Sequence, residues 1–176
     1  MKRLLFAALT AGLLSSMALA QPQMRKPGDE EKRLAYFAGT WASEGEAKAS
    51  PMGPGGKTSG RETCEWFAGG YHLICRGEGT NAMGSFKTQS TMGYDPEEKT
   101  YTFFMNTSMG DGFFVRGNVS GKVWTWNFEN KVQGKPMQGR VTITEESPTS
   151  QTFKMEVMTE GGQWLVLEES RAKKIK

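Results

Sequence analysis

The residues that most often carry chemistry in proteins are few in this chain, which has one histidine and two cysteines. The histidine, His72, lies in a predicted strand next to the double glycine Gly69-Gly70, where a lone histidine is more often structural or exposed than catalytic. One histidine cannot build a histidine-rich metal site. Cys64 and Cys75 have the spacing Cys-x10-Cys rather than Cys-x-x-Cys, which does not indicate an activated redox pair.

Glutamates offer a second kind of chemistry, general acid–base catalysis. Several lie on neighbouring predicted strands, namely Glu44, Glu46, Glu62, Glu65 and Glu78. Two of these carboxyl groups inside a barrel could exchange protons with a substrate, whereas strand glutamates more often lie on a solvated face. Both interpretations stay open at the level of the sequence.

The sequence contains no Gly-x-Ser-x-Gly and no His-Glu-x-x-His motif. Gly56-Lys57-Thr58 resembles the end of a phosphate loop, but Pro51 occupies the position of the first glycine. Thioethers favour Cu(I), but Met155 and Met158 would point to opposite faces of one strand, and methionine as a filler of a core or pocket explains them better. We therefore predict no metal site and no cofactor.

The elements that must position these residues are short strands. From Gly39 to Arg171 several segments alternate in polarity, and Gly, Asn, Asp and Pro recur roughly every 8–12 residues. Short connections make neighbouring strands antiparallel, and closure removes two exposed edges. The pattern predicts an all-β fold, an antiparallel up-and-down meander of about ten strands closed into a barrel, with one short N-terminal helix. The predicted strands are 39–48, 58–67, 71–79, 84–93, 99–107, 111–119, 122–129, 138–146, 150–159 and 163–172.

The hairpin around Gly69-Gly70 predicts a disulfide. If these two residues form the loop, Cys64 and Cys75 lie directly opposite each other in the ladder. Directly paired residues have Cα atoms about 4.5–5.5 Å apart, within the range of a disulfide. They are the only cysteines of a chain that we expect to be exported, so a structural cross-strand disulfide is predicted.

Large apolar side chains alternate along three predicted strands, which places each set on one face. They are Phe103 and Met105; Trp124, Trp126 and Phe128; and Phe153 and Met155. If all three sets point inward, they either fill the interior or line a binding site. A ten-stranded barrel is wider than the eight-stranded barrels that side chains can fill. We therefore predict that these residues bind an apolar or amphipathic small molecule.

Residues 1–20 predict a cleavable signal peptide. Lys2-Arg3 precede an apolar run over 4–14, and Ala18-Leu19-Ala20 supplies the small–x–small pattern of a cleavage site. The apolar run is too short for a stable membrane anchor. We expect cleavage after Ala20 and a periplasmic or secreted protein.

The mature chain predicts one domain. Residues 21–28 resemble a disordered leader, 29–37 a short helix, and 29–176 the barrel domain as a whole. Without Lys2 and Arg3 the chain has 20 basic and 19 acidic residues, a net charge of +1. This balance predicts no nucleic-acid partner, and the short apolar run predicts no stable membrane anchor. The oligomeric state stays open.

Several segments carry a resemblance to a known family. Gly39-Thr40-Trp41, followed by Gly45, resembles the Gly-x-Trp opening of calycins, the superfamily of lipocalins and fatty-acid-binding proteins. The further segments are Trp66-Phe67-Ala68-Gly69-Gly70, Gly93-Tyr94-Asp95 followed by Lys99-Thr100-Tyr101, and Glu169-Ser170-Arg171. In this order they resemble exported bacterial proteins of the domain-of-unknown-function 1579 family, over about residues 33–173.

The resemblance implies a lipocalin-like β-barrel and no established activity. In calycins an arginine near the chain end packs over the opening tryptophan, so the resemblance implies that Arg171 closes the barrel over Trp41. Related Gly-x-Trp barrels that bind haem use a late histidine, and residues 130–176 contain none, which argues against haem.

Three hypotheses on function follow. The first, which we favour, is a small barrel module that binds an apolar or amphipathic ligand. The second is an enzyme that uses carboxyl groups in the barrel lumen. The third is a structural or envelope domain that interacts with another protein. No catalytic residue is identified.

Overall fold

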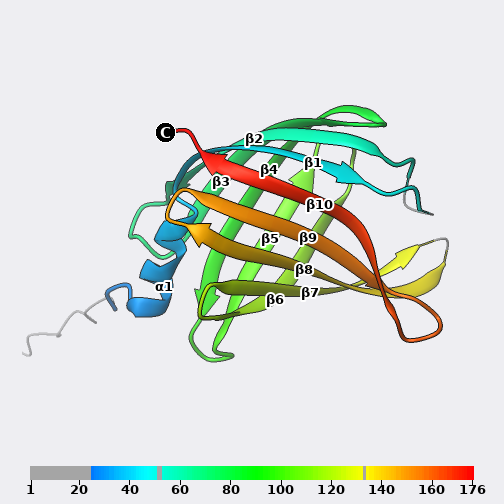
Figure 1. Cartoon of the computed structure of the whole chain (residues 1–176). Coiled ribbons are helices and arrows are strands. Elements are labelled where there is room, and N and C mark those ends of the chain that lie inside the picture. The colour runs from blue at the N-terminus through cyan, green and yellow to red at the C-terminus, as the bar shows by residue number, and fades with distance from the viewer. Residues whose placement is uncertain (1–24, 51–52, 133) are drawn as a thin grey trace, which may run out of the picture.

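The computed structural model describes residues 25–50, 53–132 and 134–176, and these form ten antiparallel strands closed into one barrel (Figure 1). The strands pair in chain order, and β1 pairs with β10 to complete the ring. The predicted signal peptide lies outside the described residues. Among the residues described, no helix is long and apolar enough to cross a membrane.

A short helical segment precedes the strands, α1 (Asp29–Arg33) continuing into the 3-10 turn η1 (Leu34–Tyr36). The strands are β1 (Gly39–Ala47), β2 (Gly56–Trp66), β3 (Leu73–Asn81), β4 (Gly84–Asp95), β5 (Thr100–Thr107), β6 (Gly112–Ser120), β7 (Val123–Val132), β8 (Lys135–Ser147), β9 (Ser150–Met158) and β10 (Trp164–Lys174). The predicted all-β barrel of ten strands is confirmed. The ends differ most at the β7–β8 turn, where β7 ends three residues later and β8 begins three residues earlier than predicted. Gly56 and Lys57, which precede the predicted strand 58–67, pair with Ala47 and Glu46.

The β2–β3 hairpin has the predicted register. Cys64 pairs with Cys75, the two sulfurs are bonded, and the Cα atoms lie 4.0 Å apart. The loop is longer than predicted, because Trp66 and Leu73 form the last pair. Within this loop the Phe67 N–H donates to the His72 carbonyl at 2.9 Å. The disulfide prediction is confirmed although the predicted two-residue loop is not.

The contact that closes the ring differs from the one implied by the family resemblance. Trp41 on β1 is the register partner of Lys174, and Arg171 is the partner of Glu44. Because successive strand residues point to opposite faces, Arg171 points away from Trp41. The Lys174 ammonium lies 4.9 Å from the Trp41 ring centroid instead. The first and last strands therefore meet as expected, with Lys174 rather than Arg171 over the tryptophan.

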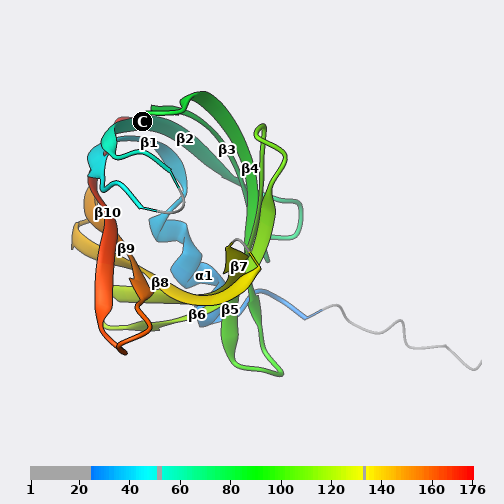
Figure 2. The same ribbon diagram turned by 90° about the vertical axis from the view of Figure 1, so that its right-hand side faces the viewer.

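The register also decides which side chains point inward. Trp41, Cys75 and Trp124 share one face of the closed sheet, and that face packs around Leu34 and Phe37 of the helical segment. Viewed along the barrel, α1 lies across one end of the ring (Figure 2). We call this the closed end and the opposite end the mouth. The core at the closed end consists of Leu34, Phe37, Cys64, Leu73, Cys75, Met92, Tyr101, Val115, Trp124 and Trp126.

The start of the helical segment is held by a buried carboxylate. Glu31, 2% exposed, accepts hydrogen bonds from the Gly28 N–H at 2.8 Å and from Arg25 at 2.5 Å. The hydrogen bond from Arg25 holds the pKa of Glu31 below its usual value. Arg25 also lies over the Tyr71 ring, 5.2 Å from its centroid. Arg25 falls in the segment predicted to be a disordered leader, so the described part of that segment, 25–28, is held to the barrel.

Candidate functional site

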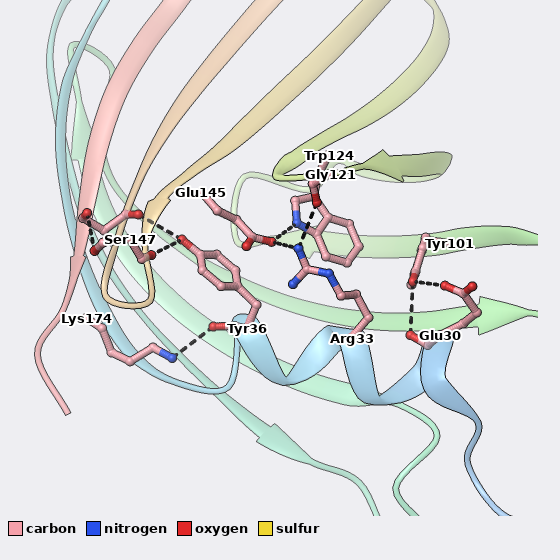
Figure 3. A network of polar contacts seen from close by, with 10 residues as sticks. Glu30, Arg33, Tyr36, Tyr101, Gly121, Trp124, Glu145, Ser147 and Lys174 are labelled. Carbon is pink, nitrogen blue, oxygen red and sulfur yellow. Dashed lines mark hydrogen bonds and ion pairs between the residues drawn. The ribbon is translucent and has the colours of Figure 1, made fainter.

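The closed end is fastened by a network around Glu145 on β8 (Figure 3). Its carboxylate accepts a hydrogen bond from the Trp124 indole N–H at 2.6 Å and from the Arg33 guanidinium at 2.5 Å. Arg33 also donates to the Gly121 carbonyl at 3.2 Å and lies 5.2 Å from the Trp124 ring centroid. The Glu145 carboxylate thus ties α1 to β7 and β8, and Arg33 ties α1 to the β6–β7 turn.

Two tyrosines complete this network (Figure 3). The Tyr101 hydroxyl donates to the Glu30 carboxylate at 2.7 Å. The Tyr36 hydroxyl donates to the Ser150 carbonyl at 3.0 Å, and Lys174 donates to the Tyr36 carbonyl at 3.0 Å. Burial raises the pKa of Tyr36 to about 12 and raises that of Tyr101 as well, so both hydroxyls stay protonated donors.

This packing bears on two of the seven predicted ligand-binding residues. Trp124 is fully buried, and its ring packs edge-on against Phe37 and Tyr101 at centroid distances of 4.9 and 4.8 Å. Trp126 is also buried and stacks on Trp124. Trp124 therefore belongs to the core of the closed end, which we call the plug. Trp126 packs on the side of Trp124 that faces the mouth.

The other predicted residues lie on the inner face nearer the mouth and are half-buried. They are Phe103 and Met105 on β5, Phe128 on β7, and Phe153 and Met155 on β9. Phe113 on β6 joins them, 6.2 Å from Phe103 between ring centroids. In a closed barrel an inward side chain keeps accessible surface only through the interior or its mouth. We call this surface the aromatic wall.

On the facing side of the ring, the inner-face residues toward the mouth are small. Strands β1 to β3 lie across the barrel from β6 to β8 (Figure 2). Their inner-face residues toward the mouth are Ser43, Gly45, Ala47, Gly56, Thr58, Gly60, Gly77 and Gly79, continued by Ser170 on β10. At Gly45 an added Cβ would lie 2.3 Å from the Ser170 Cβ, so this strand pair excludes side chains there. We call this surface the small-residue wall.

An open concavity of about 2230 Å³ lies against β1–β4 and β8–β10. Most of its side chains alternate with the inner-face residues and so belong to the outer face, for example Glu44, Arg61, Lys87 and Arg171. Phe153 is the one predicted ligand-binding residue that borders it. Six residues of the small-residue wall also border it, namely Ser43, Gly45, Thr58, Gly60, Gly79 and Ser170, whereas Phe153 is its one contact with the aromatic wall.

The five glutamates considered from the sequence are separated by the register. Glu62 alone points inward, whereas Glu44, Glu46, Glu65 and Glu78 lie on the outer face. Burial raises the pKa of Glu62, although the residue keeps some accessible surface, as expected for a carboxyl group that faces the interior.

Glu168 on β10 is a further inward carboxyl group, which the sequence did not reveal. The Thr58 hydroxyl donates to it at 3.2 Å, and burial raises the pKa of its carboxyl group. It lies two residues from Ser170 on β10 and therefore shares its inner face, and a register shift between Val166 and Glu168 ends this alternation. Glu168 is at the mouth. It pairs with Ala47, and Ala47 pairs with Gly56, which lies six residues from Glu62 along β2. At about 3.3 Å per residue the two carboxyl groups occupy different levels of the barrel and do not form the acid–base pair that the enzyme hypothesis requires.

The isolated carboxyl group at Glu62 predicts a pH-dependent stability difference. Because its folded-state pKa lies above 4.5, its contribution to stability is present below pH 4.5 and is lost as the pH rises through the raised pKa. Glu62→Gln should therefore be more stable than wild type at alkaline pH, by on the order of 1 kcal/mol, and should approach it below pH 4.5. Urea unfolding across this range measures the difference. Glu65→Gln, on the outer face of the same strand, is the control, and an equal gain there would contradict the assignment.

Comparisons with known proteins support the fold. A family model described as "Protein of unknown function (DUF1579)" matches residues 26–174. No curated protein matches the chain. The crystal structure of Rv2717c from M. tuberculosis is similar with a TM-score of 0.56 at 9% identity, covering 85% of this chain and 99% of that one. The S-type phycobiliprotein lyase CPES from Guillardia theta has a TM-score of 0.56 at 12% identity, covering 84% and 93%. At these identities the two structures bear on the fold alone.

Proposed function

The chain belongs to the family described as "Protein of unknown function (DUF1579)", and from this premise we propose that it is an exported barrel that binds an apolar or amphipathic small molecule. The ligand occupies the half of the interior nearer the mouth. Residues 1–20 serve as the export signal and are removed after Ala20.

The observation that carries this proposal is the contrast between the two walls. The inner faces of β5, β6, β7 and β9 present half-buried aromatic and methionine side chains, and the facing strands present glycine, alanine, serine and threonine. A barrel that needed only stability would fill this space, because each buried large side chain contributes about 1.5–3 kcal/mol. The plug at the closed end supplies the stability, so the mouth half is free to hold a ligand.

Filling this space should abolish binding. Ser43 lies on the inner face of β1, opposite Gly60 and Ala172. Ser43→Phe places a ring where the ligand would lie, and we expect its affinity for N-phenylnaphthylamine, an apolar fluorescent probe, to fall by about 10-fold or more. Fluorescence titration of the probe measures the effect.

The matched control is Glu44→Phe, which adds the same ring at the neighbouring exposed position on the outer face. Its probe affinity should equal that of wild type. Equal losses in both variants, or no probe binding by wild type, would contradict a ligand site in the interior.

A further inference from the structure

Glu62 lies at the level where the closed end gives way to the open half of the interior. Its register partners are Trp41 on β1 and Gly77 on β3. A carboxyl oxygen of Glu62 and the sulfurs of Cys64 and Cys75 lie within 4.8 Å of one another. Toward the mouth, the next inner-face residues on these strands are Ser43, Gly60 and Gly79, so only small residues follow Glu62 on that side.

Nothing in the described part of the chain neutralises this carboxyl group. No described residue donates a hydrogen bond to it or forms an ion pair with it. The pKa of Glu62 is raised by burial alone. The inner faces of β1 and β3 carry no charged residue. The inward cation nearest in register is Lys174, on the far side of Trp41, and its ammonium donates to the Tyr36 carbonyl at 3.0 Å.

An enclosed carboxylate without a partner is costly, because it has lost hydration and gained no hydrogen bond in return. A ligand with a positive charge would pair with this carboxylate and offset its loss of hydration. A metal ion fits poorly, since the two sulfurs beside Glu62 are bonded to each other and a single carboxylate is left as donor. An ammonium group fits well, because it is compact, carries a full charge and offers three donors.

We infer that Glu62 binds the protonated amine of an amphipathic ligand whose apolar body lies against the aromatic wall. This inference rests on the proposed function and narrows it to cationic amphiphiles. The amine enters first and reaches the level of Trp41, and the apolar chain extends along Phe103, Phe128 and Met155 toward the mouth.

The test uses two probes that differ only at the polar end, dodecylamine and dodecanol. Each displaces N-phenylnaphthylamine from the mature protein at neutral pH, where the amine is protonated. Wild type should bind the amine more tightly than the alcohol by about 10-fold or more, as expected for a charge-assisted hydrogen bond. Glu62→Gln keeps the shape of the side chain, and should bind both probes with the affinity that wild type has for the alcohol. Glu65→Gln should retain the wild-type preference.

The outcomes separate this inference from the proposed function. If both probes bind and wild type shows no preference, or if Glu62→Gln keeps the preference, the role of Glu62 is overturned while an interior ligand site stands. If neither probe displaces the fluorophore and the fluorophore itself does not bind, both are overturned. Loss of the amine preference in Glu62→Gln, with alcohol affinity unchanged, supports the inference.

Discussion

Trp124→Ala should lower the free energy of unfolding by about 3–5 kcal/mol, the range observed when a fully buried tryptophan or phenylalanine is truncated. Trp124 has no accessible surface and packs against Phe37, Tyr101 and Trp126. Its removal also leaves the Glu145 carboxylate with Arg33 as its remaining partner in the network of the closed end. Urea unfolding followed by circular dichroism measures the loss.

The same variant distinguishes a plug residue from a ligand-binding residue. If Trp124 belongs to the plug, the fraction that remains folded should bind N-phenylnaphthylamine with near wild-type affinity. Phe104→Ala removes an aromatic ring from the outer face of β5, where it is 44% exposed, and should change stability by less than about 0.5 kcal/mol. A small stability loss in Trp124→Ala together with a large loss of probe binding would reverse our assignment.

Reduction of the disulfide should cost about 2–3 kcal/mol of stability, because the bond closes a short loop in the unfolded chain. Cys64 and Cys75 are separated by 11 positions and are both buried. The midpoint of urea unfolding should fall when a reductant is added to the wild-type protein.

The double variant Cys64→Ala/Cys75→Ala is the control for this experiment. Its unfolding midpoint should lie below that of the oxidised wild type and should not respond to reductant. Thiol labelling of denatured, unreduced wild type should find no free thiol. Two free thiols in the mature protein would show that the pair is not bonded.

The sequence predicted the barrel well because its signals are local. Alternation of polarity placed the aromatic residues on one face, and the Gly69-Gly70 hairpin gave the pairing of Cys64 with Cys75. The predicted register was correct although the predicted loop was too short. When a hairpin loses pairs next to its loop, the remaining residues keep the same partners. Local patterns of this kind hold without knowledge of distant contacts.

The errors arose where distant residues decide the outcome. Lys174 rather than Arg171 covers Trp41, since the register between β1 and β10 depends on closure of the whole ring. Glu168 points inward with Ser170, because the pairing of β10 with β1 decides which face of β10 lies inside. Trp124 and Phe128 share a face of β7, but Trp124 is fully buried under the helical segment and Phe128 is half-buried nearer the mouth. Alternation gives the face of a residue and not its height along the barrel, so it could not separate the two.

The ties that seal the closed end also constrain the order of folding. Arg33 meets a partner 112 positions away in Glu145, and the Tyr36 carbonyl meets Lys174 across 138 positions. The first helix and first strand to leave the ribosome therefore cannot complete their contacts until the last strand is available. Such long-range pairing slows folding, because the loop-closure entropy is lost before the contacts are gained. We therefore expect ring closure to be a late step of folding, because both contacts need the C-terminal half of the chain.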